Sequence, residues 1–176
     1  AVALIDDAGK RPYAELDSRV DRVASALWRR GIRRGDRVAM LAWNAPDVVE
    51  LIHAVARLGA TLVPLNARLR AGELAFQLRD ADVAVFIADA ALAQTAGEAA
   101  AEAGLPGPLV FPLGEEGLAG FERAGVRDAD DPLCIMYTSG TTGLPKGVVL
   151  TYGNFFASAA GSAFNLGVLP GDRWLA

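Results

Sequence analysis

The fold is decided by residues 37–64, which read RVAMLAWNAPDVVELIHAVARLGATLVP. Within this stretch the apolar run Arg37–Ala42 predicts a strand, and Pro46 marks the start of a helix that Gly59 ends. Thr61–Val63 then predicts a second short strand. A helix between two strands is the connection that parallel sheets require, so the stretch predicts an α/β fold.

The same alternation continues on both sides of this stretch. Toward the amino end, a short strand at Val2–Ile5 precedes a helix from about Ala14 to Arg30. Toward the carboxyl end, a helix over Ala71–Asp80 precedes a strand over Val83–Ile87, and the alanine-rich stretch Ala88–Gly104 favours a partly exposed helix. The expected fold class is therefore α/β, with a mostly parallel sheet flanked by helices on both faces.

Composition and charge exclude several classes of protein. The chain has 176 residues, of which 52% are hydrophobic, and a net charge of -4. Apolar residues spread along the chain indicate a globular protein, and the negative charge gives no support for a nucleic acid or an anionic membrane as partner. No apolar run approaches the roughly 20 residues that span a bilayer. Cys134 is the only cysteine, which excludes an intrachain disulfide and favours a cytoplasmic location.

The stretch that carries chemistry is residues 131–151, DPLCIMYTSGTTGLPKGVVLT. Two apolar strands, Leu133–Tyr137 and Val148–Leu150, flank a loop that is dense in Gly, Ser and Thr. Glycines let the backbone approach a ligand closely, so that several N–H groups can face one anion, and hydroxyls and a lysine add donors for phosphate. The candidate phosphate-binding residues are Thr138, Ser139, Gly140, Thr141, Thr142, Gly143 and Lys146.

This loop differs from a Walker A loop. Pro145 precedes Lys146, Gly147 follows it, and a strand rather than a helix comes next. The alternative interpretation is a flexible hairpin loop that only joins two strands. Because hydroxyls, glycines and a lysine are concentrated together, phosphate binding is favoured over this alternative.

For the other residues that could carry chemistry, structural roles are favoured over catalytic or binding roles. The clusters Arg29-Arg30 and Arg33-Arg34 follow a predicted helix, and they are expected to complement its C-terminal dipole rather than to form a binding patch. His53 has no second His or Cys at metal-ligand spacing, so no metal site is predicted. Cys134 lies in an apolar strand as an ordinary buried thiol, and Ser139 lies outside the Gly-x-Ser-x-Gly pattern of hydrolase nucleophiles.

The run Thr138–Gly147, TSGTTGLPKG, resembles the signature loop of the adenylate-forming superfamily, which includes acyl-CoA synthetases, peptide-synthetase adenylation domains and luciferases. Three further segments are similar to family segments at corresponding places: Tyr13–Leu16, Gly35–Ala39 and Gly59–Asn66. Within the acyl-CoA synthetase branch, Thr151–Asn154 and Asp172–Ala176 look most like the o-succinylbenzoate–CoA ligases of menaquinone biosynthesis. Tyr152 stands where many relatives have histidine.

The resemblance implies a ligase that forms an acyl-adenylate from ATP and then a CoA thioester. The expected ligands are a small-molecule carboxylic acid, ATP, Mg²⁺ and coenzyme A as a substrate. No nucleic-acid partner and no membrane span are expected. A homodimer is compatible with this interpretation. The loop from Thr138 to Lys146 would orient the β- and γ-phosphates of ATP. No catalytic residue is assignable in this stretch of the family, because the other motifs are expected beyond Ala176.

The resemblance also implies that residues 1–176 are the N-terminal part of a large AMP-binding domain. The phrase at Gly31–Val38, which leads into a strand, is echoed at Gly167–Trp174. A strand is therefore expected to begin near Arg173, where the chain is about to end, and we expect a longer polypeptide whose remaining parts complete the enzyme. By itself the chain is expected to be inactive.

Three alternatives remain open at this stage. The acid could be a fatty or aryl acid instead of o-succinylbenzoate. The enzyme could be an adenylation module that loads a carrier protein. The chain could also be a non-catalytic fragment that keeps only the phosphate loop.

Overall fold

The computed structural model describes residues 1–113, 121, 123–125, 128–139, 144–169 and 171–173. The strands are β1 (Val2–Asp6), β2 (Gly9–Pro12), β3 (Arg37–Leu41), β4 (Thr61–Pro64), β5 (Val85–Ala88), β6 (Leu109–Val110), β7 (Pro132–Thr138) and β8 (Lys146–Thr151). The helices are α1 (Tyr13–Arg29), α2 (Pro46–Leu58), α3 (Ala71–Asp80), α4 (Ala93–Ala103) and α5 (Tyr152–Leu166), with one short 3₁₀ turn at Ala90–Leu92.

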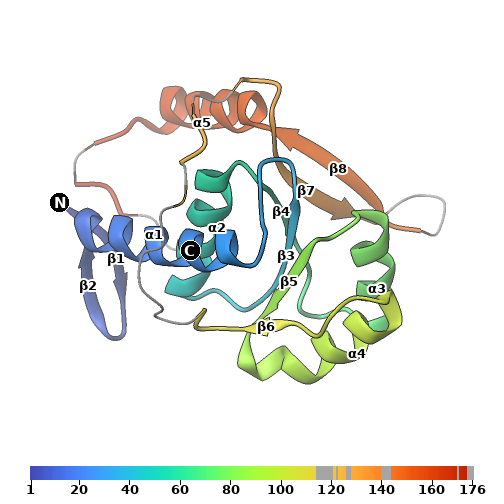
Figure 1. The fold of residues 1–176 in the computed structure, drawn as a ribbon. Helices are drawn as coiled ribbons and strands as arrows, with labels where there is room; N and C mark the ends of the chain where they lie inside the picture. The colour runs from blue at the N-terminus through green and yellow to red at the C-terminus, as the bar shows by residue number, and fades with distance from the viewer. Residues whose placement is uncertain (114–120, 122, 126–127, 140–143, 170, 174–176) are drawn as a thin grey trace.

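A six-stranded sheet in the order β6-β5-β3-β4-β7-β8 forms the centre of the molecule. The first five strands of this order are paired in parallel, and β8 runs antiparallel to β7. Helices α1 and α2 lie on one side of the sheet, and α3 and α4 lie on the other (Figure 1). The predicted α/β fold with a mostly parallel, doubly covered sheet is confirmed.

Strand β3 shows why the sequence reads as a continuous apolar run. Val38 and Met40 pack in the core beneath α1 and α2, whereas Ala39 and Leu41 pack in the core beneath α3 and α4. All four are buried. Because both faces of the strand are covered, neither set of alternating side chains can be polar.

The alanine-rich stretch forms a shorter helix than expected. Strand β5 extends to Ala88, and the Asp89 side chain accepts a hydrogen bond from the Ala91 N–H at 2.9 Å, so that α4 begins only at Ala93. One face of α4 is buried and the other is exposed, as the sequence predicted. The buried face is made of small residues that allow close packing on α3: Ala96, Ala99 and Ala100.

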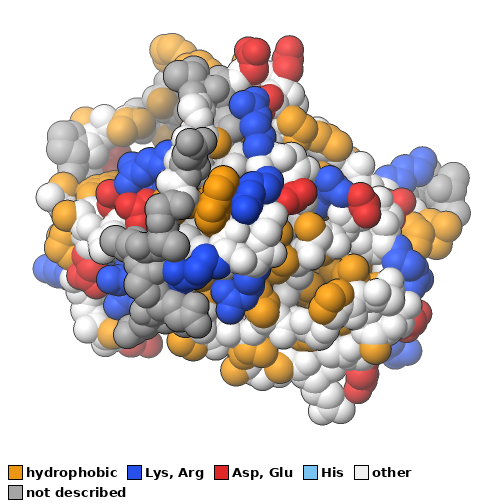
Figure 2. All heavy atoms as spheres, viewed as in Figure 1, with side chains coloured by type: hydrophobic (Ala, Val, Ile, Leu, Met, Phe, Trp, Pro, Cys, Tyr) orange, Lys and Arg blue, Asp and Glu red, His pale blue; other side chains and the backbone are white. Residues whose placement is uncertain are grey.

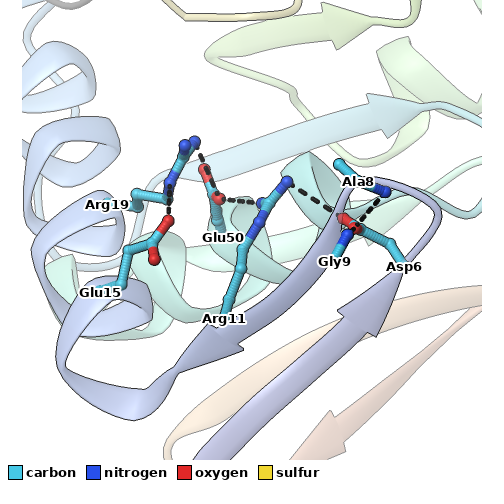
Figure 3. A network of polar contacts seen from close by, with 7 residues as sticks. All are labelled: Asp6, Ala8, Gly9, Arg11, Glu15, Arg19 and Glu50. Atoms are coloured by element: carbon cyan, nitrogen blue, oxygen red, sulfur yellow. Dashed lines mark hydrogen bonds and ion pairs between the residues drawn. The ribbon is translucent and has the colours of Figure 1, made fainter.

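The amino-terminal hairpin β1–β2 is fastened to the helices by a network of ion pairs around Glu50 (Figure 3). The Glu50 side chain is buried in α2, where Oε1 lies 3.1 Å from Arg11 Nη1 and 3.5 Å from Arg19 Nη1. Arg11 also pairs with Asp6, whose carboxylate accepts hydrogen bonds from the backbone of the hairpin turn. Burial raises the pKa of Glu50 above its ordinary value, although Arg19 and Arg11 oppose this shift.

The arginines that follow α1 complete the end of that helix. Arg30 Nη1 donates to the Ala26 carbonyl at 3.0 Å, and Arg33 Nη1 donates to the Trp28 carbonyl at 2.8 Å. The Arg33 guanidinium also lies 3.6 Å from the centre of the Trp28 ring. The predicted role at the helix terminus is confirmed for these two residues. Charged side chains of both signs are interspersed over the face drawn in Figure 2.

The edge of the molecule formed by β8 and α5 is different in character. None of the residues of α5 is buried, and Phe156 and Phe164 are 77% and 91% exposed. Strand β8 exposes Val148 and Val149, and hydrophobic side chains can be seen along it (Figure 2). We call this region, residues 146–169, the open edge. No helix in the described ranges is both long enough and apolar enough to cross a bilayer.

Candidate phosphate-binding site

Strands β7 and β8 bring the two ends of the glycine-rich loop together. Their antiparallel register places Thr138 opposite Lys146 and Tyr137 opposite Gly147. Ser139 follows Thr138 directly, and the side chains of Thr138, Ser139 and Lys146 are all exposed. The structure thus unites three of the predicted phosphate-binding residues. The other four, Gly140, Thr141, Thr142 and Gly143, lie outside the described residues.

The loop lies at the edge of the sheet where ligands of α/β proteins usually bind. Strand β7 runs parallel to β4, and Thr138 is the last residue of β7. The loop therefore follows the carboxyl end of a parallel strand. Crevices outside these carboxyl ends are the common ligand sites of open α/β sheets.

A groove of about 840 Å³ borders the loop. Its walls come from the carboxyl ends of β4 and β7, the first turns of α3, and the two residues before Lys146. They are formed by Pro64, Leu65, Asn66, Leu69, Gly72, Glu73, Phe76, Gln77, Met136, Tyr137, Thr138, Ser139, Leu144 and Pro145. A groove of this size with mixed apolar and polar walls is suited to a small-molecule ligand.

The charges around the groove leave Lys146 available for an anion. Within the part of the chain that the structure describes, Lys146 forms no ion pair. The Glu73 carboxylate, which lines the groove, instead accepts a hydrogen bond from the Arg70 N–H at 2.9 Å. Two hydroxyls that line the groove, and a lysine paired across the hairpin with the first of them, supply donor types that a polyphosphate needs.

A second, smaller cavity of about 200 Å³ at the amino ends of β3 and β4 is less suited to anions. Two arginines line it, but both are already paired. Arg34 Nη2 lies 2.8 Å from Asp131 Oδ2, and Arg37 forms an ion pair with Asp82. Lys146, which forms no ion pair among the described residues, begins β8 at the carboxyl edge of the sheet instead.

Neither Cys134 nor His53, for which the sequence favoured structural roles, has the surroundings of a catalytic or metal-binding residue within the described ranges. Cys134 is buried in β7, and burial raises the pKa of its thiol to about 11, so that little nucleophilic thiolate forms at neutral pH. His53 lies on the exposed side of α2. Among the described residues, no three side chains of His, Cys, Asp or Glu are gathered closely enough to hold a metal ion.

Sequence reasoning missed the wall of the groove opposite the loop. Asn66 and Gln77 lie more than 60 residues before Thr138 in the chain, and only the tertiary fold brings them into the wall of the groove beside it. It also assigned no role to Tyr137, although this residue directly precedes the loop. Its aromatic side chain, directly before the loop, was the one feature of the sequence that could have indicated a role for Tyr137.

The sequence profile of the AMP-binding enzyme family matches residues 1–176. The chain belongs to the AMP-binding enzyme family. The family resemblance predicted from the sequence is confirmed.

Among curated AMP-binding enzymes, the chain is similar to a 2-succinylbenzoate–CoA ligase of Bacillus cereus. The two are 38% identical over 170 residues, which is 95% of this chain and 33% of the relative. The chain thus spans about a third of the length of the curated relatives it matches.

Among solved AMP-binding enzymes, the chain is similar to the O-succinylbenzoate coenzyme A synthetase of Bacillus subtilis in complex with ATP and magnesium ion. The TM-score is 0.88 with 34% identity, over 99% of this chain and 46% of that chain. Another structure of that enzyme holds an acyl-adenylate intermediate. A fatty acyl CoA synthetase of Mycobacterium tuberculosis also matches, with a TM-score of 0.79 and 34% identity over 92% of this chain and 34% of that one.

Proposed function

We propose that this chain is part of an ATP-dependent carboxylate–CoA ligase whose acid is 2-succinylbenzoate, a reaction of menaquinone biosynthesis. The observation that carries the proposal is the pairing of Thr138 with Lys146 beside the groove at the carboxyl edge of the sheet. The choice of acid is supported by the identity to 2-succinylbenzoate–CoA ligases over almost the whole chain.

In the first step of this reaction, a carboxylate oxygen attacks the α-phosphorus of ATP and pyrophosphate leaves, which yields an acyl-adenylate. The hydroxyls of Thr138 and Ser139 and the ammonium of Lys146 would hold the β- and γ-phosphates and stabilise the charge that develops on pyrophosphate. Mg²⁺ would neutralise part of the same charge. The work of these three residues is electrostatic and orienting, and none of them transfers a proton.

In the second step, the sulfur of CoA attacks the acyl carbon and AMP leaves, so that a thioester replaces the mixed anhydride. No described residue is assigned to this step. The residues that contact CoA and the acyl group are expected in the remaining polypeptide, because the curated relatives are about three times as long as this chain.

The open edge supports the proposal that residues 1–176 are the first part of a larger AMP-binding domain. Its exposed apolar side chains, such as Phe156 and Phe164, are the kind that further polypeptide would bury. We therefore propose that the 176-residue chain by itself does not turn over. Steady CoA-thioester formation by this chain alone would contradict that proposal.

A second candidate is a fatty-acyl or aryl-CoA synthetase. The identity to the fatty acyl CoA synthetase of Mycobacterium tuberculosis, 34%, equals that to the Bacillus subtilis enzyme. The described residues include the two ends of the phosphate loop, and none of them is assigned to the acyl group. They therefore support the activation chemistry more strongly than the choice of acid. An adenylation module that loads a carrier protein and a non-catalytic fragment that keeps only the phosphate loop are the remaining alternatives.

The test is a coupled thioester assay on the full-length enzyme, with 2-succinylbenzoate compared with fatty and aryl acids. A clear preference for 2-succinylbenzoate supports the whole proposal. Activity on another acid alone keeps the mechanism and rejects the acid, and activity on none of them favours the carrier-protein alternative.

The role of Lys146 is tested in the same assay. Replacing Lys146 by Ala should lower kcat/KM for ATP by about 100-fold, because one charged phosphate contact is lost. Lys10 on β2 is the matched control, since it is the only other lysine and lies at the hairpin far from the groove. Lys10→Ala should leave the activity unchanged, and an equal loss in both variants would reject the assignment of Lys146.

Cytoplasmic location and a homodimer stay predictions of the sequence. The first is supported by the single, buried cysteine. Cell fractionation tests the first prediction and light scattering of the full-length enzyme tests the second.

A further inference from the structure

Tyr137 connects the strand that leads into the phosphate loop with the helix on the other side of the groove. It is the next-to-last residue of β7 and directly precedes Thr138. Its hydroxyl donates a hydrogen bond to Asp80 Oδ2 at 2.7 Å, and the Gln77 carbonyl oxygen lies 3.3 Å away as a second acceptor. Both acceptors belong to α3. A single side chain therefore fastens β7 to α3.

The ring of Tyr137 also contacts the other end of the loop. Gly147, which follows Lys146, is paired with Tyr137 across the hairpin. A Cβ atom at Gly147 would lie 3.2 Å from Tyr137 Cζ and 3.0 Å from Ile135 Cγ2, both tighter than ordinary packing. A glycine at this position therefore leaves room for the tyrosine ring beside β8. Tyr137 thus contacts the residues on either side of the loop.

These contacts set the geometry of the groove. Tyr137 and Gln77 line it together with Thr138 and Ser139. Because Tyr137 is anchored on α3, the separation between the α3 wall and the first residues of the loop depends on this hydrogen bond. Loss of the bond would let the wall and the loop move relative to one another.

We infer that Tyr137 is a positioning residue for the phosphate loop, and that its hydrogen bond to Asp80 holds Thr138 and Lys146 where they meet the β- and γ-phosphates. The inference rests on the proposed function, because it takes those phosphates as the ligand of the loop. Tyr137 itself does not touch the reacting atoms. It acts through its neighbours on β7 and β8.

The chemistry of the pair suits a permanent anchor. A phenol that donates to a carboxylate makes a charge-assisted hydrogen bond, which is shorter and stronger than a neutral one. Burial raises the pKa of Tyr137 well above its ordinary value, and the Asp80 carboxylate raises it further, so the hydroxyl keeps its proton. Asp80 is exposed, so that water can satisfy it when the hydroxyl is removed. Breaking the bond should therefore affect ligand geometry more than folding.

The experiment measures the affinities of ATP with Mg²⁺ and of AMP for the full-length enzyme by calorimetry. The variants are Tyr137→Phe, Asp80→Ala, Asp80→Asn and the double variant Tyr137→Phe/Asp80→Ala. AMP lacks the β- and γ-phosphates, so it reports any general loosening of the protein without engaging the loop. Asp80→Asn is the conservative control, because its amide oxygen can still accept the tyrosine hydrogen bond.

We expect Tyr137→Phe and Asp80→Ala each to weaken ATP binding about tenfold, since a small displacement of positioned groups is costly. AMP affinity should stay within about twofold of the wild type in every variant, because AMP lacks the phosphates that the loop is proposed to position. Asp80→Asn should bind ATP nearly as the wild type does. The double variant should lose no more than either single one, because both substitutions break the same bond.

Each other result has a definite meaning. Unchanged ATP affinity in Tyr137→Phe and Asp80→Ala overturns the inference while the proposed function stands. An equal loss of ATP and AMP affinity also overturns it, because the role is then structural. A wild-type enzyme that fails to bind ATP overturns the proposed function itself, and the inference with it.

Discussion

The interior strand β3 and the open edge of residues 146–169 are both rich in apolar residues but are covered very differently. β3 lies between two layers of helices, and four of its five residues are buried. On the open edge, neither β8 nor α5 contains a buried residue. The interior is thus stabilised by contacts within the described residues, whereas the open edge keeps apolar surface for further contacts.

The phosphate loop lies where these two regions meet. Strand β7 pairs with the covered strand β4 on one side and with the open strand β8 on the other. The loop therefore joins a strand inside the sheet to the strand at its edge, and Tyr137 bonds the first of these strands to α3. Binding sites at such borders can be completed by chain that arrives from elsewhere, as we propose for this enzyme.

The largest effect expected from this contrast is in the interior. Leu51 is fully buried in the core between α2 and the sheet. Replacing Leu51 by Ala should lower the free energy of unfolding by about 3 kcal/mol, because a cavity forms in a packed core. Urea unfolding of the 176-residue chain, followed by circular dichroism, measures this change. A loss below about 1 kcal/mol would show that the interior is loosely packed and would remove the contrast.

The next effect tests whether α5 is docked at all. In its first turn, a Cβ atom at Gly153 would lie 2.9 Å from the Ala129 carbonyl oxygen, whereas one at Gly161 of the same helix would meet nothing within 4 Å. Gly153→Ala should therefore destabilise the chain by about 1–3 kcal/mol. Gly161→Ala, the matched control, should stabilise it by about 0.5–1 kcal/mol. If both substitutions stabilise the chain in urea unfolding, the first turn of α5 does not pack as described.

The sequence predicted those elements whose signals are local. Helix α3 has the predicted bounds, and β3 and α2 differ from them by one residue at most. Strand β6 was missed because its two residues become a strand only by pairing with β5, a long-range contact. Strand β2 was missed because Lys10 and Arg11 do not read as an apolar strand, and Arg11 is held there by Glu50.

The candidate site divides in the same way. The donors Thr138, Ser139 and Lys146 were found because they are contiguous with a recognisable loop. The partners of Tyr137 on α3 were not found, because they lie 57 and 60 residues away in the chain. Contacts between distant elements follow from the topology of the sheet, which local patterns do not specify.

A smaller effect concerns pH and the ion network that joins the hairpin to the interior. Burial raises the pKa of Glu50 above its unfolded value, so between these two values the folded chain binds more protons than the unfolded chain. The stability that this group contributes is present below the unfolded pKa and is lost as the pH rises through the folded pKa. Glu50→Gln cannot titrate, so its stability relative to the wild type should rise as the pH increases from the unfolded pKa of Glu50 through its raised folded pKa. Urea unfolding at several pH values tests this, and a flat or falling difference would contradict it.

The smallest effect is expected on the open edge. Phe156 is 77% exposed on α5, so that little buried surface is lost when it is replaced by Ala, and the free energy of unfolding of the 176-residue chain should change by less than about 0.5 kcal/mol. In the full-length enzyme the same substitution should cost about 3 kcal/mol or more if further polypeptide buries this ring, because a cavity would replace it. Ser162, another exposed residue of α5, provides the control, since Ser162→Ala should be nearly neutral in both proteins. A loss at Phe156 that appears only in the full-length enzyme would identify the open edge as an internal interface. Equal, negligible changes in both proteins would leave this ring in solvent and would remove the support that it gives to the proposed domain.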